Sequence, residues 1–210
     1  MDIVKIDKNK VDETEVVRVA KHFLNGEVVA YPTDTIYGLG CIASDKQAVK
    51  KVAQIKRRTE GKNFIVLMKS FCMVHDYCFV SKKQDALLRG YWAPRSSDLN
   101  HLETWPNKEA ITVILKSRGL LKHLESEDGK IAVRIPKDRF LLDLLKKINQ
   151  SIISTSLNVS GSELIDDVSD ITSKFGEELP DLAVDGGKII NQKASKLVDI
   201  SDVNNIMFIR

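Results

Sequence analysis

The sequence predicts an α/β protein with a mixed sheet. Short apolar runs that end at a proline or a polar turn alternate with amphipathic stretches of helical spacing along the whole chain. The chain has 210 residues, of which 43% are hydrophobic, which is enough for a sizeable core. Because no repeat, low-complexity segment or linker-like stretch divides the chain, we expect a single domain over residues 1–210.

The first half alternates strands and helices with clear boundary signals. After a strand-like alternation over residues 1–5, Asp12 and Glu15 form a capping-box-like start for a helix, which Asn25-Gly26 ends. The other elements expected here are strands at 28–31, 64–68 and 111–115, a helix capped by Ser44 or Asp45, and a helix from Ser81 to about Tyr91.

The second half continues the alternation. Pro136 stops a strand at 131–135, and Asp138 begins a strongly amphipathic helix that reaches Ile148. A strand follows from residue 152. A weaker helix is expected at 169–178, with short strands at 182–184, 197–200 and 206–209. The polar stretch 94–108 is predicted to be a surface loop.

Bulk properties restrict the class of protein. The net charge of +3 is too small to indicate a nucleic-acid partner by itself, although clustered basic residues would still bind an anion. The longest apolar run, 64–68, is far too short for a membrane span, and no secretion signal is visible, so we expect a cytoplasmic protein. Three cysteines agree with a reducing compartment. Cys72, His75 and Cys78 lack the paired spacing of a structural zinc site and are better explained as two small buried hydrophobic residues and a surface histidine.

The stretch IISTSLNVSG at 152–161 begins as an apolar strand and then turns polar. In an extended chain Ser154, Ser156 and Asn158 share one face, whereas Thr155 and Leu157 share the other. Two hydroxyls and an amide on one face are suited to holding a nucleotide and its phosphates.

The stretch YPTDTIYGLG at 31–40 leaves a strand and reaches two glycines. Gly38 and Gly40 either serve turn chemistry or allow a ligand to approach the backbone closely. The acid Asp34 between the hydroxyls of Thr33 and Thr35 is typical of a ligand-binding loop at a strand end.

Two further segments carry cations in unusual places. IKRRTEGK at 55–62 has four cations, which either complement a helix end in water or, if the chain unwinds after Ile55, let Lys56 and Arg58 hold one polyphosphate together. Arg134 lies in the apolar strand IAVRIP, where it needs a partner: a protein carboxylate, or the carboxylate of a ligand.

No hydrolase-type nucleophile is evident, because His22, His75, His101 and His123 adjoin no suitable Ser or Cys motif. The chain also lacks a Walker phosphate loop and a GxGxxG fingerprint. Catalysis would therefore depend on positioning and electrostatics, which suits phosphate chemistry.

Taken together, YPTDTIYGLG, Lys56-x-Arg58, the VRIP at 133–136 and STSLNVSG at 154–161 resemble the YrdC/YciO-like family, in the family's order and over nearly the whole chain. The DGG at 185–187 and the segment from Ser195 to Asp199 resemble the carboxyl-terminal strand region of its short form. The resemblance implies a twisted open sheet with flanking helices and a concave basic cavity.

The resemblance also implies a reaction. The family's threonylcarbamoyl-AMP synthases convert L-threonine, bicarbonate and ATP, used with Mg²⁺, into threonylcarbamoyl-AMP and pyrophosphate. Partner proteins then transfer the threonylcarbamoyl group to an adenosine of tRNA. No tightly bound cofactor and no protein-held metal are implied, and the cavity of such a protein could also bind tRNA or double-stranded RNA.

The family's motifs map onto named positions here. Lys56 and Arg58 match the phosphate-binding pair, with Ser156 and Asn158 beside them. Thr33, Arg134 and Ser195 match positions that hold L-threonine. The remaining matches, all on the ATP side, are Lys130, Ser154 and Arg210.

The sequence also departs from the synthase pattern. Synthases usually have Pro after the arginine of the pair and Pro-Leu further on, whereas this chain has Thr59 and Asn63-Phe64, a pair that resembles the YciO branch. The segment 93–108 and Lys196 also differ from the pattern. A YciO-like protein that binds a nucleotide or RNA without efficient synthase activity is therefore the alternative interpretation.

Overall fold

The structure, a computed structural model, describes residues 1–8, 10–58, 64–92, 109–190 and 193–210. Its strands form one open mixed sheet in the order β1-β8-β2-β3-β7-β4-β6-β5-β9-β10. The strands are β1 (Asp2–Lys5), β2 (Val29–Tyr31), β3 (Gly38–Gly40), β4 (Ile65–Leu67), β5 (Ile111–Lys116), β6 (Lys130–Arg134), β7 (Ile152–Ser156), β8 (Leu182–Asp185), β9 (Lys196–Asp199) and β10 (Met207–Phe208). The helices are α1 (Glu13–Leu24), α2 (Lys46–Ile55), α3 (Phe71–Tyr77), α4 (Lys82–Trp92), α5 (Arg139–Ile148) and α6 (Ile171–Phe175), with 3₁₀ turns at Lys122–Leu124 and Val168–Asp170.

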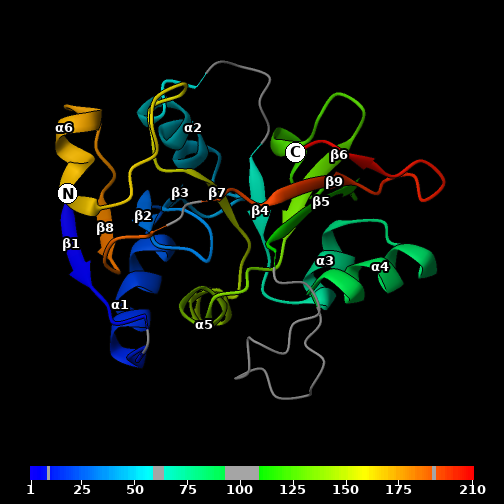
Figure 1. Cartoon of the computed structure of the whole chain (residues 1–210), viewed down its shortest axis with the longest axis horizontal. Coiled ribbons are helices and arrows are strands. Elements are labelled where there is room, and N and C mark those ends of the chain that lie inside the picture. Colours follow the sequence, from blue (N-terminus) through cyan, green and yellow to red (C-terminus); the bar gives the residue numbers. More distant parts are fainter. Residues whose placement is uncertain (9, 59–63, 93–108, 191–192) are drawn as a thin grey trace.

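The sheet separates two hydrophobic cores. Helices α1 and α5 lie side by side and pack against one face, and α2 packs on the other (Figure 1). Strand β2 contributes alternate side chains to the two cores. Val29 and Tyr31 point into the core beneath α1 and α5 (the α1–α5 core), whereas Ala30 points into the core beneath α2 (the α2-side core). Strand β7 joins the two halves of the sheet, because it pairs with β3 on one side and β4 on the other, antiparallel in both cases.

The α1–α5 pair covers only part of its face. Further along the sheet, β4, β6, β5 and β9 direct Val66, Val133, Val113 and Val198 into the α2-side core. Their neighbours in sequence point to the opposite face and line a cavity there: Ile65, Ala132, Ile114 and Leu197. The fold therefore leaves one end of a sheet face open to a ligand.

The predicted mixed α/β architecture is confirmed, and two short elements were missed. Strand β3 was expected to be a glycine-containing turn, and α3 was not predicted at all. The expected helix at 169–178 is a 3₁₀ turn followed by the short α6, which ends at Phe175. The predicted surface loop at 94–108 lies outside the described residues. No helix in the described parts of the chain is both long and apolar enough to cross a bilayer.

Candidate functional site

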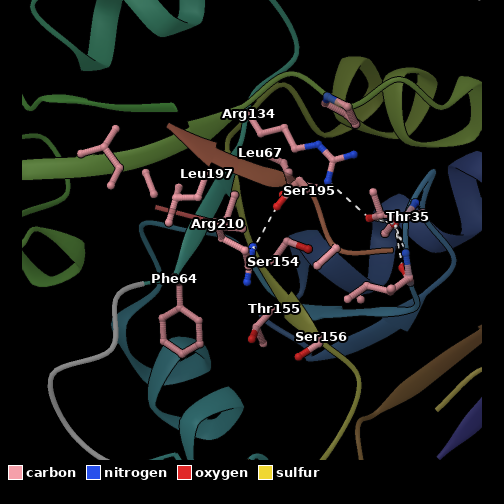
Figure 2. Close-up of a pocket in the computed structure, with 18 of the residues that line it drawn as sticks. Thr35, Phe64, Leu67, Arg134, Ser154, Thr155, Ser156, Ser195, Leu197 and Arg210 are labelled. Atoms are coloured by element: carbon pink, nitrogen blue, oxygen red, sulfur yellow. Dashed lines mark hydrogen bonds between the residues drawn. The ribbon is translucent and has the colours of Figure 1, made fainter. Parts of the chain in front are cut away.

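A cavity of about 670 Å³ opens over β7, β4, β6, β5 and β9. Figure 2 shows its side chains converging from segments that are far apart in sequence, with Arg134 at one end and Phe64, Thr155 and Ser156 at the other. Of the predicted site residues, eight line the cavity: Thr33, Arg58, Lys130, Arg134, Ser154, Ser156, Ser195 and Arg210. Lys56 and Asn158 lie behind its wall.

The chain does unwind where a shared phosphate site would require it to. Helix α2 ends at Ile55, Lys56 is its C-cap, and Arg57 has a left-handed φ of 47°. Arg58 then extends into the cavity, where its Nη1 donates to Thr155 Oγ1 at 3.2 Å and its guanidinium lies 4.5 Å from the ring centroid of Phe64. Burial lowers the pKa of Arg58 from its ordinary value.

Lys56 is almost fully buried, at 2% exposure. Its Nζ donates to Ser156 O at 2.6 Å, to Asn158 O at 2.9 Å and to Asn158 Oδ1 at 3.0 Å. Burial, assisted by the nearby charge of Arg58, lowers the pKa of Lys56 to about 8. The ammonium thus connects the end of α2 to the turn after β7 and fixes the cavity wall from behind.

Asn158 completes this connection. Its Oδ1 accepts from Ser156 Oγ at 2.7 Å, and its Nδ2 donates to Ser162 O at 2.7 Å. Asn158 is 9% exposed and is absent from the cavity lining, so its amide organises the turn and orients the Ser156 hydroxyl.

Strand β7 follows the predicted alternation with one exception. Ser154 and Ser156 line the cavity together, as expected. Thr155 was assigned to the opposite face, but it also lines the cavity, which reaches around the end of the strand, and its hydroxyl accepts the bond from Arg58. The unbroken run of three hydroxyls was the signal in the sequence that could have included Thr155.

The other end of the cavity contains a buried ion pair. Arg134 Nη2 lies 2.6 Å from Asp34 Oδ1, and Nη1 lies 3.4 Å from Thr35 Oγ1. Arg134 is 6% exposed and still lines the cavity, so the two interpretations of this residue, a paired core arginine and a ligand clamp, are compatible. The sequence indicates Asp34 only as an acid between two hydroxyls. Its role as the counter-ion of Arg134 depends on the fold, because β4, β6 and the loop after β2 meet at this end of the cavity.

Thr33 uses its hydroxyl within its own loop. Its Oγ1 donates to Ile36 O at 2.7 Å and accepts from the amides of Thr35 and Ile36 at 2.9 and 3.1 Å. In addition, Lys8 Nζ donates to Thr33 O at 2.9 Å and lies 3.1 Å from Asp138 Oδ2, at the start of α5. This end of the cavity is therefore rigidly preorganised.

The carboxyl-terminal strands supply the third side. Ser195 Oγ lies 2.8 Å from Thr112 Oγ1, and Arg210 Nε donates to Ser195 O at 3.2 Å. Lys130 Nζ lies 2.8 Å from Asp128 and 3.1 Å from Asp199, and these two carboxylates raise the pKa of the lysine. The described lining thus holds side-chain cations together with Asp34, Asp128 and Asp199, so its charges are mixed, with the cations slightly in excess.

The glycines of the predicted turn have a different role. Neither Gly38 nor Gly40 has a left-handed φ, and both pair in β3. A Cβ on Gly40 would lie 2.0 Å from Ile153 O, so the close approach that requires glycine is that of β7 rather than a ligand. Gly38 does line the cavity.

The cysteine–histidine segment has ordinary structural partners. Cys78 is buried as expected, whereas the expectation of burial is wrong for Cys72, which is exposed. His75 Nε2 lies 2.9 Å from Asp85 Oδ1. Among the residues that the structure describes, no three His, Cys, Asp or Glu side chains are grouped so as to hold a metal ion.

Comparison with known proteins agrees with this architecture. The family model Sua5/YciO/YrdC, described as telomere recombination, matches residues 21–210. A threonylcarbamoyl-AMP synthase of Pseudoalteromonas translucida (strain TAC 125) is 27% identical over 169 residues, which cover 80% of this chain and 84% of that protein. The uncharacterized protein YciO of Escherichia coli (strain K12) is 28% identical over 180 residues, covering 84% and 79%.

Two solved structures share the fold. E. coli YciO has a TM-score of 0.80 at 24% identity, over 100% of this chain and 93% of that one. P. abyssi Sua5 complexed with L-threonine has a TM-score of 0.83 at 21% identity, over 100% of this chain but only 57% of the Sua5 chain. Since the family model matches all but the first twenty residues, this chain belongs to the Sua5/YciO/YrdC family.

Proposed function

We propose that this chain is an L-threonylcarbamoyladenylate synthase, a nucleotidyltransferase that forms threonylcarbamoyl-AMP and pyrophosphate from L-threonine, bicarbonate and ATP. The observation that carries the proposal is that a single cavity holds Arg58 and Ser156 at one end and a buried Arg134 at the other. These two ends suit the two charged substrates, a polyphosphate and an amino-acid carboxylate.

The polyphosphate end is supported by the arrangement around β7. Arg58 offers forked donors to phosphate oxygens, and the hydroxyls of Ser154 and Ser156 lie along the same wall. Lys56 and Asn158 support that wall, and the ammonium of Lys56 adds positive charge close behind it. Lys130 and Arg210, on the side formed by β6 and the chain end, complete the proposed ATP site.

The amino-acid end is supported by Arg134 and its neighbours. A guanidinium held by Asp34 is preorganised to receive the carboxylate of L-threonine. Thr33 and Ser195 also line this cavity and are proposed to contact the same substrate. A relative in the family, P. abyssi Sua5, has been solved in complex with L-threonine.

The chemistry needs no protein nucleophile. The threonine amine and bicarbonate condense to a carbamate with loss of one water molecule. A carbamate oxygen then attacks the α-phosphorus of ATP, and the bond from that phosphorus to pyrophosphate breaks as pyrophosphate leaves. The protein aligns the carbamate with the phosphate and offsets the charge of the leaving group with Arg58 and its cationic neighbours. Mg²⁺ would arrive with ATP and be ligated mainly by phosphate oxygens and water, and it would supply further charge neutralisation. We place the protein in the cytoplasm, where partner proteins would transfer the product's threonylcarbamoyl group to tRNA.

Pyrophosphate release tests this proposal. Protein mixed with ATP, L-threonine, bicarbonate and Mg²⁺ should release pyrophosphate and form threonylcarbamoyl-AMP, and omission of threonine should stop both. Arg58→Gln should lower kcat/KM by about 100-fold, because it removes the charge that stabilises the leaving group. Arg134→Gln should mainly raise the KM for threonine. Turnover that does not depend on threonine would contradict the proposal.

A second candidate function is favoured by Phe64, which lines the cavity, and by the similarity to YciO. In this case the cavity binds a nucleotide, tRNA or double-stranded RNA without efficient synthesis. Binding of a tRNA transcript that weakens steeply with salt, in protein that shows no pyrophosphate release, would favour this candidate. Absence of RNA binding at low salt would rule out its RNA-binding form.

A further inference from the structure

Phe64 is the described residue at which this chain departs most visibly from the synthase pattern. It directly precedes β4, is 7% exposed and lines the cavity beside Thr155 (Figure 2). Ile65 pairs with Ser154 in an antiparallel register, so continuing that register by one residue sets Phe64 opposite Thr155. The backbone at Phe64 is therefore positioned by the strand pairing that begins at Ile65.

Arg58 is placed differently. It lies just beyond the end of α2, where Arg57 has a left-handed φ and the Arg58 backbone N–H donates to Ala53 O at 2.9 Å. This cap fixes the backbone of Arg58, and the direction of its long side chain depends on the contacts that the side chain makes. Its guanidinium lies over the Phe64 ring, 4.5 Å from the centroid, and donates to Thr155 at 3.2 Å. An aromatic face holds a guanidinium by its flat side, which orients the N–H groups at its edge and lowers the entropy lost on binding an anion.

We propose that Phe64 is a positioning residue for phosphate binding: its ring supports the Arg58 guanidinium in the cavity in the orientation that receives the ligand's phosphates. The inference rests on the phosphate site of the proposed function and names the residue that aligns that site's arginine. A leucine at this position would fill the space but would offer no π face.

The test is a double-mutant cycle with inorganic pyrophosphate as the probe, measured by calorimetry at fixed salt. Phe64→Leu should weaken pyrophosphate binding about tenfold, whereas Phe64→Tyr, which keeps the ring, should stay within about twofold of wild type. In an Arg58→Gln background, Phe64→Leu should have no further effect. Phe64→Met serves as a second ring-free variant of similar length in case the leucine variant folds poorly.

A ligand-free measurement tests the contact itself. The Arg58 side-chain N–H resonance should carry an upfield ring-current shift in wild type and Phe64→Tyr, and lose it in Phe64→Leu and Phe64→Met. The inference is overturned if the leucine and methionine variants bind pyrophosphate as tightly as wild type. It is also overturned if Phe64→Leu weakens pyrophosphate binding as much in the Arg58→Gln background as in wild type. Wild-type protein that binds no pyrophosphate would instead overturn the phosphate site of the proposed function, and this inference with it.

Discussion

At the scale of single residues, Lys56 is the cation whose surroundings differ most from a solvated lysine. Two carbonyls and an amide oxygen accept from its almost fully buried ammonium at 2.6, 2.9 and 3.0 Å, and the Ser156 hydroxyl lies at 3.5 Å. Lys56→Met keeps the length of the side chain but leaves these buried acceptors without their donor. We expect the free energy of unfolding to fall by about 3 kcal/mol, measured by urea denaturation.

Lys51 provides the matched control for this variant. It lies five residues earlier, within α2, and its Nζ donates to both carboxylate oxygens of Asp181, but its side chain is 44% exposed. Lys51→Met should therefore cost less than about 1 kcal/mol. If both variants lost the same free energy of unfolding, the buried hydrogen bonds of Lys56 would contribute no more to stability than the exposed ion pair of Lys51.

The lowered pKa of Lys56 gives a prediction about pH. Burial lowers this pKa to about 8 in the folded protein, whereas an unfolded lysine titrates near 10.4. Between these two values the unfolded chain binds more protons at this position, so the free energy of unfolding should rise with pH there. The cost of burying the charge is fully present below pH 8 and is relieved above it. Relative to Lys56→Met, wild type should gain up to about 1.4 kcal/mol per pH unit. If the free energy of unfolding changed with pH in the same way in wild type and Lys56→Met, the lowered pKa of Lys56 would be contradicted.

At the scale of elements, the contact between β3 and β7 depends on Gly40. An added Cβ would lie 2.0 Å from Ile153 O and 2.9 Å from the Tyr31 hydroxyl. Gly40→Ala should therefore force the two strands apart and destabilise the protein by about 3 kcal/mol, measured by thermal unfolding. Gly90→Ala is the matched control, because in α4 no atom lies within 4 Å of its added Cβ. It should stabilise the helix by about 0.5–1 kcal/mol. If Gly40→Ala left the stability unchanged, β3 and β7 would not approach each other as closely at Gly40 as the distance to Ile153 O indicates.

The same two strands show what the sequence could predict. Apolar periodicity predicted α1, α2 and α5 and most of the strands, because each buries an apolar stripe. Helix α4 was predicted from its Ser81 cap, since its buried face includes the polar Gln84. β3 consists of Gly38-Leu39-Gly40, which has too few side chains to show an alternation of apolar and polar residues. The sequence pattern therefore could not predict this strand. Helix α3 spans only seven residues, and its signals, the Ser70 N-cap and the buried Val74, are too short to stand out.

The candidate site was predictable to a similar extent. Cations and hydroxyls at strand and helix ends pointed to Arg58, Arg134 and Ser156, since local patterns reveal such groups. The partners were not predictable, because they depend on tertiary register. The pairing of Asp34 with Arg134, and the stacking of Phe64 under Arg58, join segments that only the folded sheet brings together.

At the scale of the whole molecule, helices α1 and α5 cover only part of one sheet face. Most residues that stabilise the fold on that face are therefore different from those that line the cavity. The α1–α5 core fills one part of a sheet face, and the cavity adjoins it, with Leu67 and Leu141 at the boundary belonging to both. Val19, fully buried in α1, belongs to that core and lies outside the cavity lining. Val19→Ala should cost about 1–2 kcal/mol of stability by creating a void. It should leave the Kd for ATP unchanged when folded protein is titrated.

Mapping the ATP response across the chain extends this argument. Amide chemical shifts should change on ATP addition at the ends of α2 and β7 and along β9, where the lining residues lie, and stay constant through α1. The same titration of Arg58→Gln should lose the changes near β7 first, because the phosphates would be released there while Lys130 and Arg210, on the side formed by β6 and the chain end, still contact the nucleotide. Shifts spread evenly over both halves of the sheet would instead indicate that binding rearranges the whole fold, and that the two cores are coupled.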